Sequence, residues 1–414
     1  MSNTPSTNYV TDQELNFESD PTDLSRLILA DKDKVIEFVG MLNSMDQKEI
    51  GDRRLVVAIG TGGTISMIEI EGDDGKKIKI PSLDFDDIFQ KTEPSLRDKF
   101  IVKDLPIFKI DSSQMQYTHV HDLAIIKTYI ETYLKKEFAG FLFIHGTDTM
   151  AEASSIMANM LGEDLVKPIV YTGSQTSINE ERSDAGKNVR DALYTLASMD
   201  AERQADIVIV FGDGIIYAYG AQKVHEKSSN AFDSPMLELA GELSVPGSII
   251  ELQKWTRQRA AQATRSRIFT GKSHLLEIDS KMSMDSGFVE YQIEHPSVRG
   301  VSIATYGAGT ADMEIVEAAA KAIHGKQIPG FAFNPASFGA ANKEKHAIYP
   351  SEEKLARLGF ETIRMTPEFG RGKYELAIRR FSGNINEIRD FMRRQYLGEI
   401  PTEITRRRTA LLRH

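Results

Sequence analysis

Four short apolar segments constrain the fold of this chain more than any other feature of its sequence. They are Leu55–Ile59, Phe141–Ile144, Ile169–Tyr171 and Ile207–Phe211, and small or polar residues follow each of them. Short, continuously apolar segments of this kind are typical of buried strands in a parallel sheet. Three of the four strand ends carry threonine or serine beside glycine, which suits a site built at one edge of a sheet.

Helical patterns separate these segments. Apolar residues recur at helical spacing in two stripes: Ala153, Ile156, Met157, Met160 and Leu161, then Val189, Ala192, Leu193, Leu196 and Ala197. Alternation of strands and helices predicts an α/β domain with a doubly wound parallel sheet. In such sheets the ligand binds outside the carboxyl ends of the strands.

A second, smaller α/β unit follows in the sequence. Val301–Thr305 and Gly330–Phe333 have the character of strands, and Met313–Ile323 is an alanine-rich helical segment. We therefore expect a partly helical extension over residues 1–50, a larger domain over 51–265, a linker over 266–290 and a smaller domain over 291–414.

The ends of the chain differ from its middle. Residues 1–20 are polar and acidic and are expected to be disordered, whereas residues 22–43 carry apolar residues at helical spacing. This helical segment is interpreted as a packing extension or an oligomer contact. The basic residues Arg406–Arg408 near the other end are interpreted as a solvated tail.

Composition excludes several functional classes. The absence of cysteine rules out disulfides, thiolate metal sites and cysteine nucleophiles. A net charge of -10 disfavours a nucleic-acid binder. The start of the chain lacks the features of a secretory signal, and no segment approaches 18 apolar residues, so we expect a cytoplasmic protein without a membrane partner. The sequence has no metal-ligand spacing and no dinucleotide fingerprint, so no cofactor is predicted.

Two strand ends contain residues that suit acyl-transfer chemistry. The first reads Thr61-Gly62-Gly63-Thr64, where a threonine hydroxyl can act as a nucleophile once a base removes its proton. The alternative is a tight turn with a capping threonine. The second, His145–Met150, contains Asp148 at the start of a helix, where an N-cap role is the alternative. His145 alone is more typical of a core histidine than of a catalyst.

Two further segments have a functional and a structural interpretation. Lys223 is either an ordinary surface lysine or, if it is held beside a threonine, a group that accepts a proton. Asp111–Gln114 contains Ser112 and Ser113, which either bind a carboxylate or form a serine-rich turn.

Taken in order, these segments resemble the bacterial-type L-asparaginase/glutaminase family, and most closely its cytoplasmic type I branch. The resemblance covers residues 53–392. It rests on TGGTI at 61–65, HGTDTM at 145–150, PIVYTGSQ at 168–175, RSDAGKN at 182–188, KVHEKSSNAFDSP at 223–235, RGVSIATYGAGT at 299–310 and MTPE at 365–368.

The resemblance implies a set of catalytic roles. Thr64 would be the nucleophile that forms an acyl-enzyme, and Thr147, Asp148 and Lys223 would form the relay that activates a hydroxyl or water. Backbone N–H groups near Thr64 and Thr147 would hold the oxyanion.

The resemblance also implies how the substrate is bound. Asp148 would bind the substrate ammonium, and Ser112 and Ser113 its carboxylate, with Gly63 and Gly146 beside them. Family members are usually homodimers or homotetramers, so a homo-oligomer is expected.

The chain departs from the family in three places. The loop over 66–85 lacks the tyrosine that assists the nucleophile; Lys79 stands near its place, and Tyr117 is a candidate substitute. Gln114 replaces an aspartate. Thr310 replaces an asparagine, and the three residues 220–222 before the lysine are also unusual. These changes bear on the substrate more than on the reaction.

The predicted function is hydrolysis of L-asparagine to L-aspartate and ammonia through a threonine acyl-enzyme. One alternative is the glutaminase subunit of a tRNA-dependent amidotransferase, in which the N-terminal extension is β-rich. The other is an asparaginase homologue that binds an amino acid without catalysis; the intact set of Thr64, Thr147, Asp148 and Lys223 argues against it.

Overall fold

The structure is a computed structural model of the 414-residue chain. It describes residues 20, 22–71, 76–81, 85–162, 165–201, 203–243, 249–252, 268, 274–279, 285–306, 310–333, 350–394 and 397–399. The predictions for residues 1–19, for the turn glycines at 307–309 and for the arginines at 406–408 lie outside these ranges.

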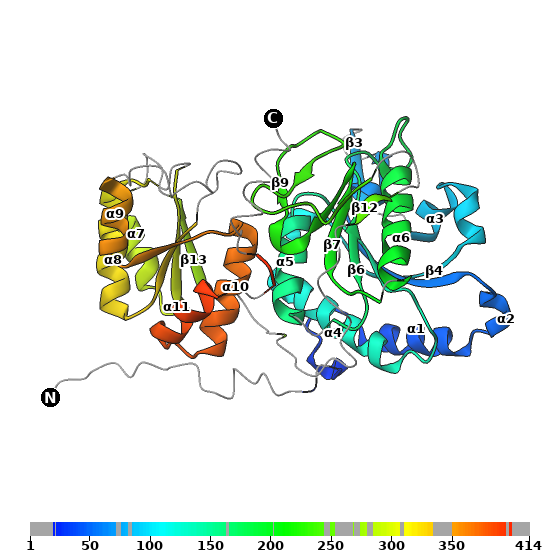
Figure 1. The fold of residues 1–414 in the computed structure, drawn as a ribbon, viewed down its shortest axis with the longest axis horizontal. Helices are drawn as coiled ribbons and strands as arrows, with labels where there is room; N and C mark the ends of the chain where they lie inside the picture. Colours follow the sequence, from blue (N-terminus) through cyan, green and yellow to red (C-terminus); the bar gives the residue numbers. More distant parts are fainter. Residues whose placement is uncertain are drawn as a thin grey trace.

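An eight-stranded sheet forms the centre of the larger part of the molecule (Figure 1). Its order is β12-β11-β8-β7-β6-β5-β1-β4, and the strands from β7 to β4 run parallel. The strands are β1 (Arg54–Gly62), β4 (Phe100–Ile110), β5 (Phe141–Ile144), β6 (Ile169–Thr172), β7 (Ile207–Phe211), β8 (Gly214–Tyr217), β11 (Gly241–Leu243) and β12 (Ile249–Leu252). The four predicted strands are confirmed as its parallel core.

Helices cover both faces of this sheet. Successive residues of β1 point to opposite sides, so Val57 packs with α4 (Tyr117–Tyr133) and α5 (Met150–Leu161). Ala58 packs instead on the side of α6 (Ala185–Ala201). The short helices α3 (Phe85–Gln90) and η4 (Pro94–Asp98) lie on this second side. The predicted doubly wound architecture is therefore confirmed.

The N-terminal extension is helical and packs against α4. It consists of η2 (Leu24–Arg26), α1 (Lys32–Ser44) and α2 (Gln47–Ile50). The apolar stripe of α1 is buried in the same core as α4: Val35, Phe38, Val39 and Leu42. This contact supports the interpretation of residues 22–43 as a packing extension.

A buried carboxylate fixes the start of the extension. Asp122 of α4 accepts hydrogen bonds from the backbone N–H groups of Ile28, Leu29 and Ala30 at 2.7–3.1 Å. Burial by itself raises the pKa of the Asp122 carboxyl, but the hydrogen bonds from His121 and these amides bring it below its ordinary value.

A separate four-stranded parallel sheet forms the smaller part of the molecule (Figure 1). Its strands are β13 (Leu275–Asp279), β14 (Gly300–Ala304), β15 (Gly330–Phe333) and β16 (Phe360–Ile363). One face packs with α7 (Ser286–Glu294), α8 (Met313–Lys326) and α9 (Pro350–Arg357). The smaller α/β unit is confirmed. Strand β13 falls inside the range 266–290 that was predicted to be a linker, and the domain boundaries stay a prediction.

Helix α10 (Pro367–Arg380) joins the two sheets. With α11 (Ile385–Arg393) it covers the other face of the smaller sheet, and it also packs along α5 of the larger part. The apolar residues of α10 consequently belong to the same core cluster as α4 and α5. None of the helices in the described ranges is long and apolar enough to cross a membrane.

Candidate functional site

The turn after β1 is pressed against the turns that follow β4 and β5. Gly62 and Gly63 have φ values of 98° and 90°, a region that favours glycine. A Cβ atom on Gly63 would lie 2.4 Å from the backbone of Gly146, and one on Gly62 would lie 2.3 Å from the Ile110 carbonyl oxygen. The backbones of three strand ends therefore meet in direct contact, at the sheet edge where a ligand was expected.

The predicted nucleophile follows this turn directly. Thr64 is the first residue of the short helix η3 (Thr64–Ser66) and is half-buried. Thr61 beside it uses its hydroxyl to bond the Ile144 carbonyl at 2.9 Å, which ties β1 to β5. Because Gly63 contacts Gly146, the turn of Thr64 lies against the loop that carries Thr147.

The serine turn after β4 contributes one buried and one exposed hydroxyl. Asp111 caps η5 (Ser112–Gln114) and accepts the N–H and hydroxyl of Ser113, and these bonds lower the pKa of the Asp111 carboxyl. Ser112 is buried, and its hydroxyl would lie 2.5 Å from a Cβ on Gly146. The structure thus brings Ser112 to the other turns, while the Ser113 hydroxyl is held by Asp111.

Lys223 is held beside a threonine and an aspartate. It lies on β9 (Gln222–Lys223), a two-residue strand that follows η6 (Ala218–Gly220) and pairs with β10 (Phe232–Asp233). Its ammonium nitrogen lies 3.1 Å from the Thr147 hydroxyl and 2.7 Å from the Asp148 carboxylate. Only 15% of the Lys223 side chain is exposed, so the surface-lysine interpretation is wrong.

The N-cap interpretation of Asp148 is also wrong. Helix α5 begins at Met150, and its cap residue is Thr149 rather than Asp148. The Thr149 hydroxyl donates to the Ser112 carbonyl at 2.7 Å, which ties the turn after β5 to the turn after β4. Asp148 keeps 54% of its side chain exposed, so its carboxylate is open to a ligand as well as to Lys223.

His145 belongs to the core, as its alternative interpretation expected. Its ring is fully buried, and Nδ1 donates to the Gly146 carbonyl at 2.7 Å. Burial lowers the pKa of His145 to about 4, so the ring is neutral at neutral pH. This hydrogen bond holds the Gly146–Thr147 peptide, which follows the His145–Gly146 peptide that faces Gly63.

The segment predicted as a flexible loop over 66–85 contains a hairpin. Its strands are β2 (Met67–Glu71) and β3 (Lys77–Pro81), joined to the body by Ser177, whose hydroxyl donates to the Met67 carbonyl at 2.7 Å. Lys79 pairs with Glu69 in the backbone register, and its side chain lies outside the described part.

Tyr117, the candidate substitute for the tyrosine that residues 66–85 lack, begins α4. Its ring packs, partly buried, against the core that α4 shares with α5 and α10, and burial raises the pKa of its phenol. Charged groups of α5 and α10 lie near it, namely Glu152, Glu375, Arg371 and Arg379. Its role as a substitute stays a prediction.

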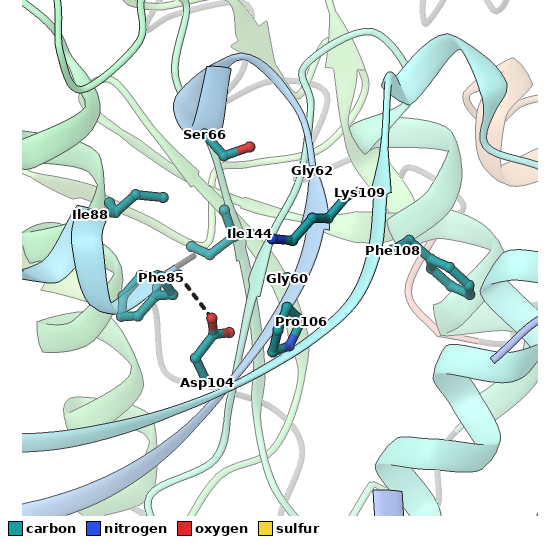
Figure 2. Close-up of a pocket in the computed structure, with 10 residues that line it drawn as sticks. All are labelled: Gly60, Gly62, Ser66, Phe85, Ile88, Asp104, Pro106, Phe108, Lys109 and Ile144. Carbon is teal, nitrogen blue, oxygen red and sulfur yellow. Dashed lines mark hydrogen bonds between the residues drawn. The ribbon is translucent and has the colours of Figure 1, made fainter. Parts of the chain in front are cut away.

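A small pocket adjoins the outer side of the first turn, and Figure 2 shows its lining. Gly62 and Ser66 contribute from the turn, and Asp104 of β4 accepts the N–H of Phe85 at 2.8 Å across it. The predicted catalytic and binding residues are not among its lining residues. Within the described ranges, no group of three or more histidine, aspartate or glutamate side chains is placed to hold a metal ion.

Two contacts near the site were missed by the sequence analysis. Ser177 holds the base of the hairpin, and Glu368 of α10 accepts a hydrogen bond from Gln222, the neighbour of Lys223, at 3.0 Å. The sequence contained a signal for the contact between Gln222 and Glu368. Gln222 is one of the unusual residues before Lys223, and Glu368 ends a segment that resembles the family. Their partners are 110 and 146 residues away in the sequence, which local patterns do not reveal.

Comparison with known proteins gives a consistent picture for the larger domain. The family described as "Asparaginase, N-terminal" matches residues 55–255. An L-asparaginase of Thermococcus kodakarensis is 32% identical over 179 residues, which cover 43% of this chain and 50% of that protein. The matched region spans about half the length of the first curated relatives.

Two further similarities extend over most of the chain. A glutamyl-tRNA(Gln) amidotransferase subunit of Saccharolobus islandicus is 26% identical over 374 residues, covering 86% of this chain and 78% of that protein. The solved structure of the thermostable L-asparaginase from Thermococcus kodakarensis superposes with a TM-score of 0.67 and 22% identity, covering 84% of this chain and 100% of that one. This last similarity supports the fold.

Proposed function

We propose that this chain is an amidohydrolase of the asparaginase family that converts L-asparagine to L-aspartate and ammonia; the family match over residues 55–255 and the similarity to an L-asparaginase support this. One observation carries the proposal most: the Lys223 ammonium contacts both the Thr147 hydroxyl and the Asp148 carboxylate. Thr147 and Asp148 lie on the loop that touches the turn of Thr64. A nucleophile beside a hydroxyl, a cation and a carboxylate is the arrangement that acyl transfer requires.

The proposed reaction has two halves. In the first, the Thr64 oxygen attacks the side-chain amide carbon, its proton passes to the relay, and the C–N bond breaks as ammonia takes up a proton. This leaves the substrate acyl group on Thr64 as an ester. In the second half, a water held near Thr147 attacks the ester, gives its proton to the relay, and releases the acid and the free Thr64 hydroxyl.

The backbone of the converging turns supplies the remaining groups. N–H groups near Thr64 and Thr147 are proposed to hold the oxyanion of each tetrahedral intermediate, and loss of one such donor typically costs about 10²–10³ in rate. The exposed part of Asp148 is proposed to bind the substrate ammonium, and the turn of Ser112 and Ser113 its carboxylate. Gly63 and Gly146 allow the backbone to approach the substrate closely.

The test is ammonia release from L-asparagine and L-glutamine by the purified protein. Thr64→Ala and Lys223→Met are each expected to reduce kcat by about 10³-fold or more, because the two residues act as one unit. Thr64→Ser keeps a hydroxyl and should retain part of the activity. If the protein releases ammonia from no amide, the amidohydrolase function is rejected. If Thr64→Ala keeps full activity, the assignment of Thr64 as the nucleophile is rejected.

A second candidate is supported by one observation. The similarity to the amidotransferase protein covers most of both chains, whereas the asparaginase relative matches half of its own length. The helical extension of α1 and α2 differs from the β-rich extension expected for such an amidotransferase. Co-purification with a second protein, and glutaminase activity that depends on it, would favour this candidate over a stand-alone asparaginase.

A homo-oligomer is part of the proposal because family members usually assemble. Sedimentation of the purified chain tests it, and a monomer with full ammonia release would contradict it.

A further inference from the structure

The start of α10 touches the strand that carries Lys223. Glu368 lies in the first turn of α10, and its carboxylate accepts the Gln222 side-chain N–H at 3.0 Å. Gln222 is 6% exposed, Glu368 is half-buried, and burial raises the pKa of the Glu368 carboxyl above its ordinary value. The contact holds the Gln222 amide firmly, because its loss would leave the buried amide without this acceptor.

The geometry of β9 makes this contact relevant to Lys223. The strand has two residues, and successive side chains of a strand point to opposite faces. Lys223 points to Thr147 and Asp148, so Gln222 points the other way, to α10. A bond on the far side of so short a strand fixes the rotation of its backbone and hence the direction of the lysine.

Helix α10, which contacts β9 through Glu368, also packs against α5, the helix that follows Thr147 and Asp148. Gly372 of α10 packs against Asn159 of α5, and Asn159 donates to the Phe369 carbonyl at 3.4 Å. Arg371 bridges Glu152 of α5 and Glu277 of β13 at 3.5 and 2.9 Å. Because α5 begins directly after the loop of Asp148, α10 is bound both to the element that positions Asp148 and to the one that positions Lys223.

We propose that Glu368 is a positioning residue of the site: through Gln222 it sets the placement of Lys223 against Thr147 and Asp148. The inference rests on the proposed amidohydrolase function. It assigns to helix α10 a part in the reaction, although Glu368 itself does not touch the reacting atoms. It also gives a role to Gln222, one of the residues by which this chain departs from its family.

The experiment compares Glu368→Leu, Glu368→Gln, Gln222→Leu and the double variant Gln222→Leu/Glu368→Leu. With L-asparagine as substrate, Glu368→Leu is expected to lower kcat about 10- to 100-fold with less than about threefold change in KM, because the lysine is displaced while the binding groups stay. Glu368→Gln keeps an acceptor for Gln222 and should retain most of kcat. The double variant should lose no more than either single leucine variant.

Arg379→Gln is the matched control. Arg379 lies on the same helix, but its ion pair is with Glu375, one turn earlier on α10, at 2.8 Å, rather than with α5 or β9. It should lower the melting temperature while kcat stays within about twofold of the unmodified protein. The pH profile of kcat should shift in Glu368→Leu and stay in place in Arg379→Gln.

Three results would overturn the inference: unchanged kcat in Glu368→Leu, equal loss of kcat in Arg379→Gln, or additive losses in the double variant. Failure of the proposed function is recognised separately, because the unmodified protein would then release no ammonia. In that case the melting temperatures of the same four variants still decide whether Gln222 and Glu368 are coupled.

Discussion

The floor of the proposed site and the hairpin that follows it, proposed here as its cover, are built in different ways. The floor consists of the turns Gly62–Thr64, Asp111–Ser113 and His145–Asp148, whose backbones touch so closely that a Cβ on Gly63 would overlap Gly146. The hairpin of β2 and β3 is tied at its base to the Ser177 hydroxyl, which donates to the Met67 carbonyl, and Lys77 on it is 78% exposed. The groups proposed to stabilise charge are thus held by the core, while the described part of the hairpin is more exposed.

This difference has a physical reason. Donors that stabilise an oxyanion are effective because they need no rearrangement during the reaction, so they belong on packed strand ends. A cover has to open for substrate and product, so elements with few buried contacts suit it. Substitutions in the floor should therefore change chemistry and stability together, and substitutions in the hairpin should change access.

The largest effect is expected for Gly63→Ala. The new methyl group would meet the Gly146 backbone at 2.4 Å, and φ of 90° is itself strained for alanine. Strain and overpacking together should cost about 3 kcal/mol or more in unfolding free energy, and ammonia release should fall about 100-fold or more. Thermal melting and steady-state kinetics measure the two quantities.

Gly383→Ala is the control that separates the effect of backbone strain from the effect of the steric clash at Gly63. Gly383 has a similar φ of 83°, but a Cβ there would meet nothing within 4 Å, and it follows α10 outside the proposed site. It should lose only about 1–2 kcal/mol and keep full activity. If Gly63→Ala behaved like Gly383→Ala, the close packing of the floor would not matter to function.

Much of this fold was predictable because the strands of a sheet that is covered on both faces are continuously apolar in sequence. The strands Phe141–Ile144 and Ile207–Phe211 are continuously apolar since both sets of their side chains are buried. The candidate site residues beyond strand ends were predicted from the same pattern together with the family motifs, and their catalytic roles stay a prediction. Local order along the chain was enough for the strands.

The hairpin and the α10 contact needed information of another kind. Met67–Glu71 and Lys77–Pro81 carry a period-two alternation of apolar and charged residues, but the family resemblance predicts a loop there. The contact of Gln222 with Glu368 depends on how two sheets are joined, which sequence spacing does not contain. Tyr117 is a candidate for its chemistry alone, and its packing against the core of α4, α5 and α10 could not be predicted from the sequence.

A smaller effect is expected for Ser177→Ala at the base of the hairpin. The substitution leaves the Met67 carbonyl without its 2.7 Å donor, which should cost about 1 kcal/mol locally. The hairpin should be cleaved faster in limited proteolysis, and kcat/KM should fall by about threefold to tenfold while the global melting temperature changes little.

Ser174→Ala is the matched control for the hairpin base. Its hydroxyl donates within the same loop, to the Thr176 carbonyl, rather than to the hairpin. Proteolysis of the hairpin should therefore stay at the rate of the unmodified protein. Equal acceleration in both variants would mean that the whole loop, rather than the Ser177 bond, retains the hairpin.

The smallest effect is expected for the ion pair on the hairpin itself. Lys77 lies 3.0 Å from Glu69, but 78% and 49% of the two side chains are exposed, so water and salt screen their attraction. Lys77→Ala, Glu69→Ala and the double variant should each change the unfolding free energy by less than about 0.5 kcal/mol, with no coupling between the two substitutions. A coupling above about 1 kcal/mol, or a marked loss of kcat in any of the three, would show that the hairpin is held by its own charges. The contrast between a packed floor and a loosely attached cover would then have to be abandoned, because the cover would be as firmly built as the floor.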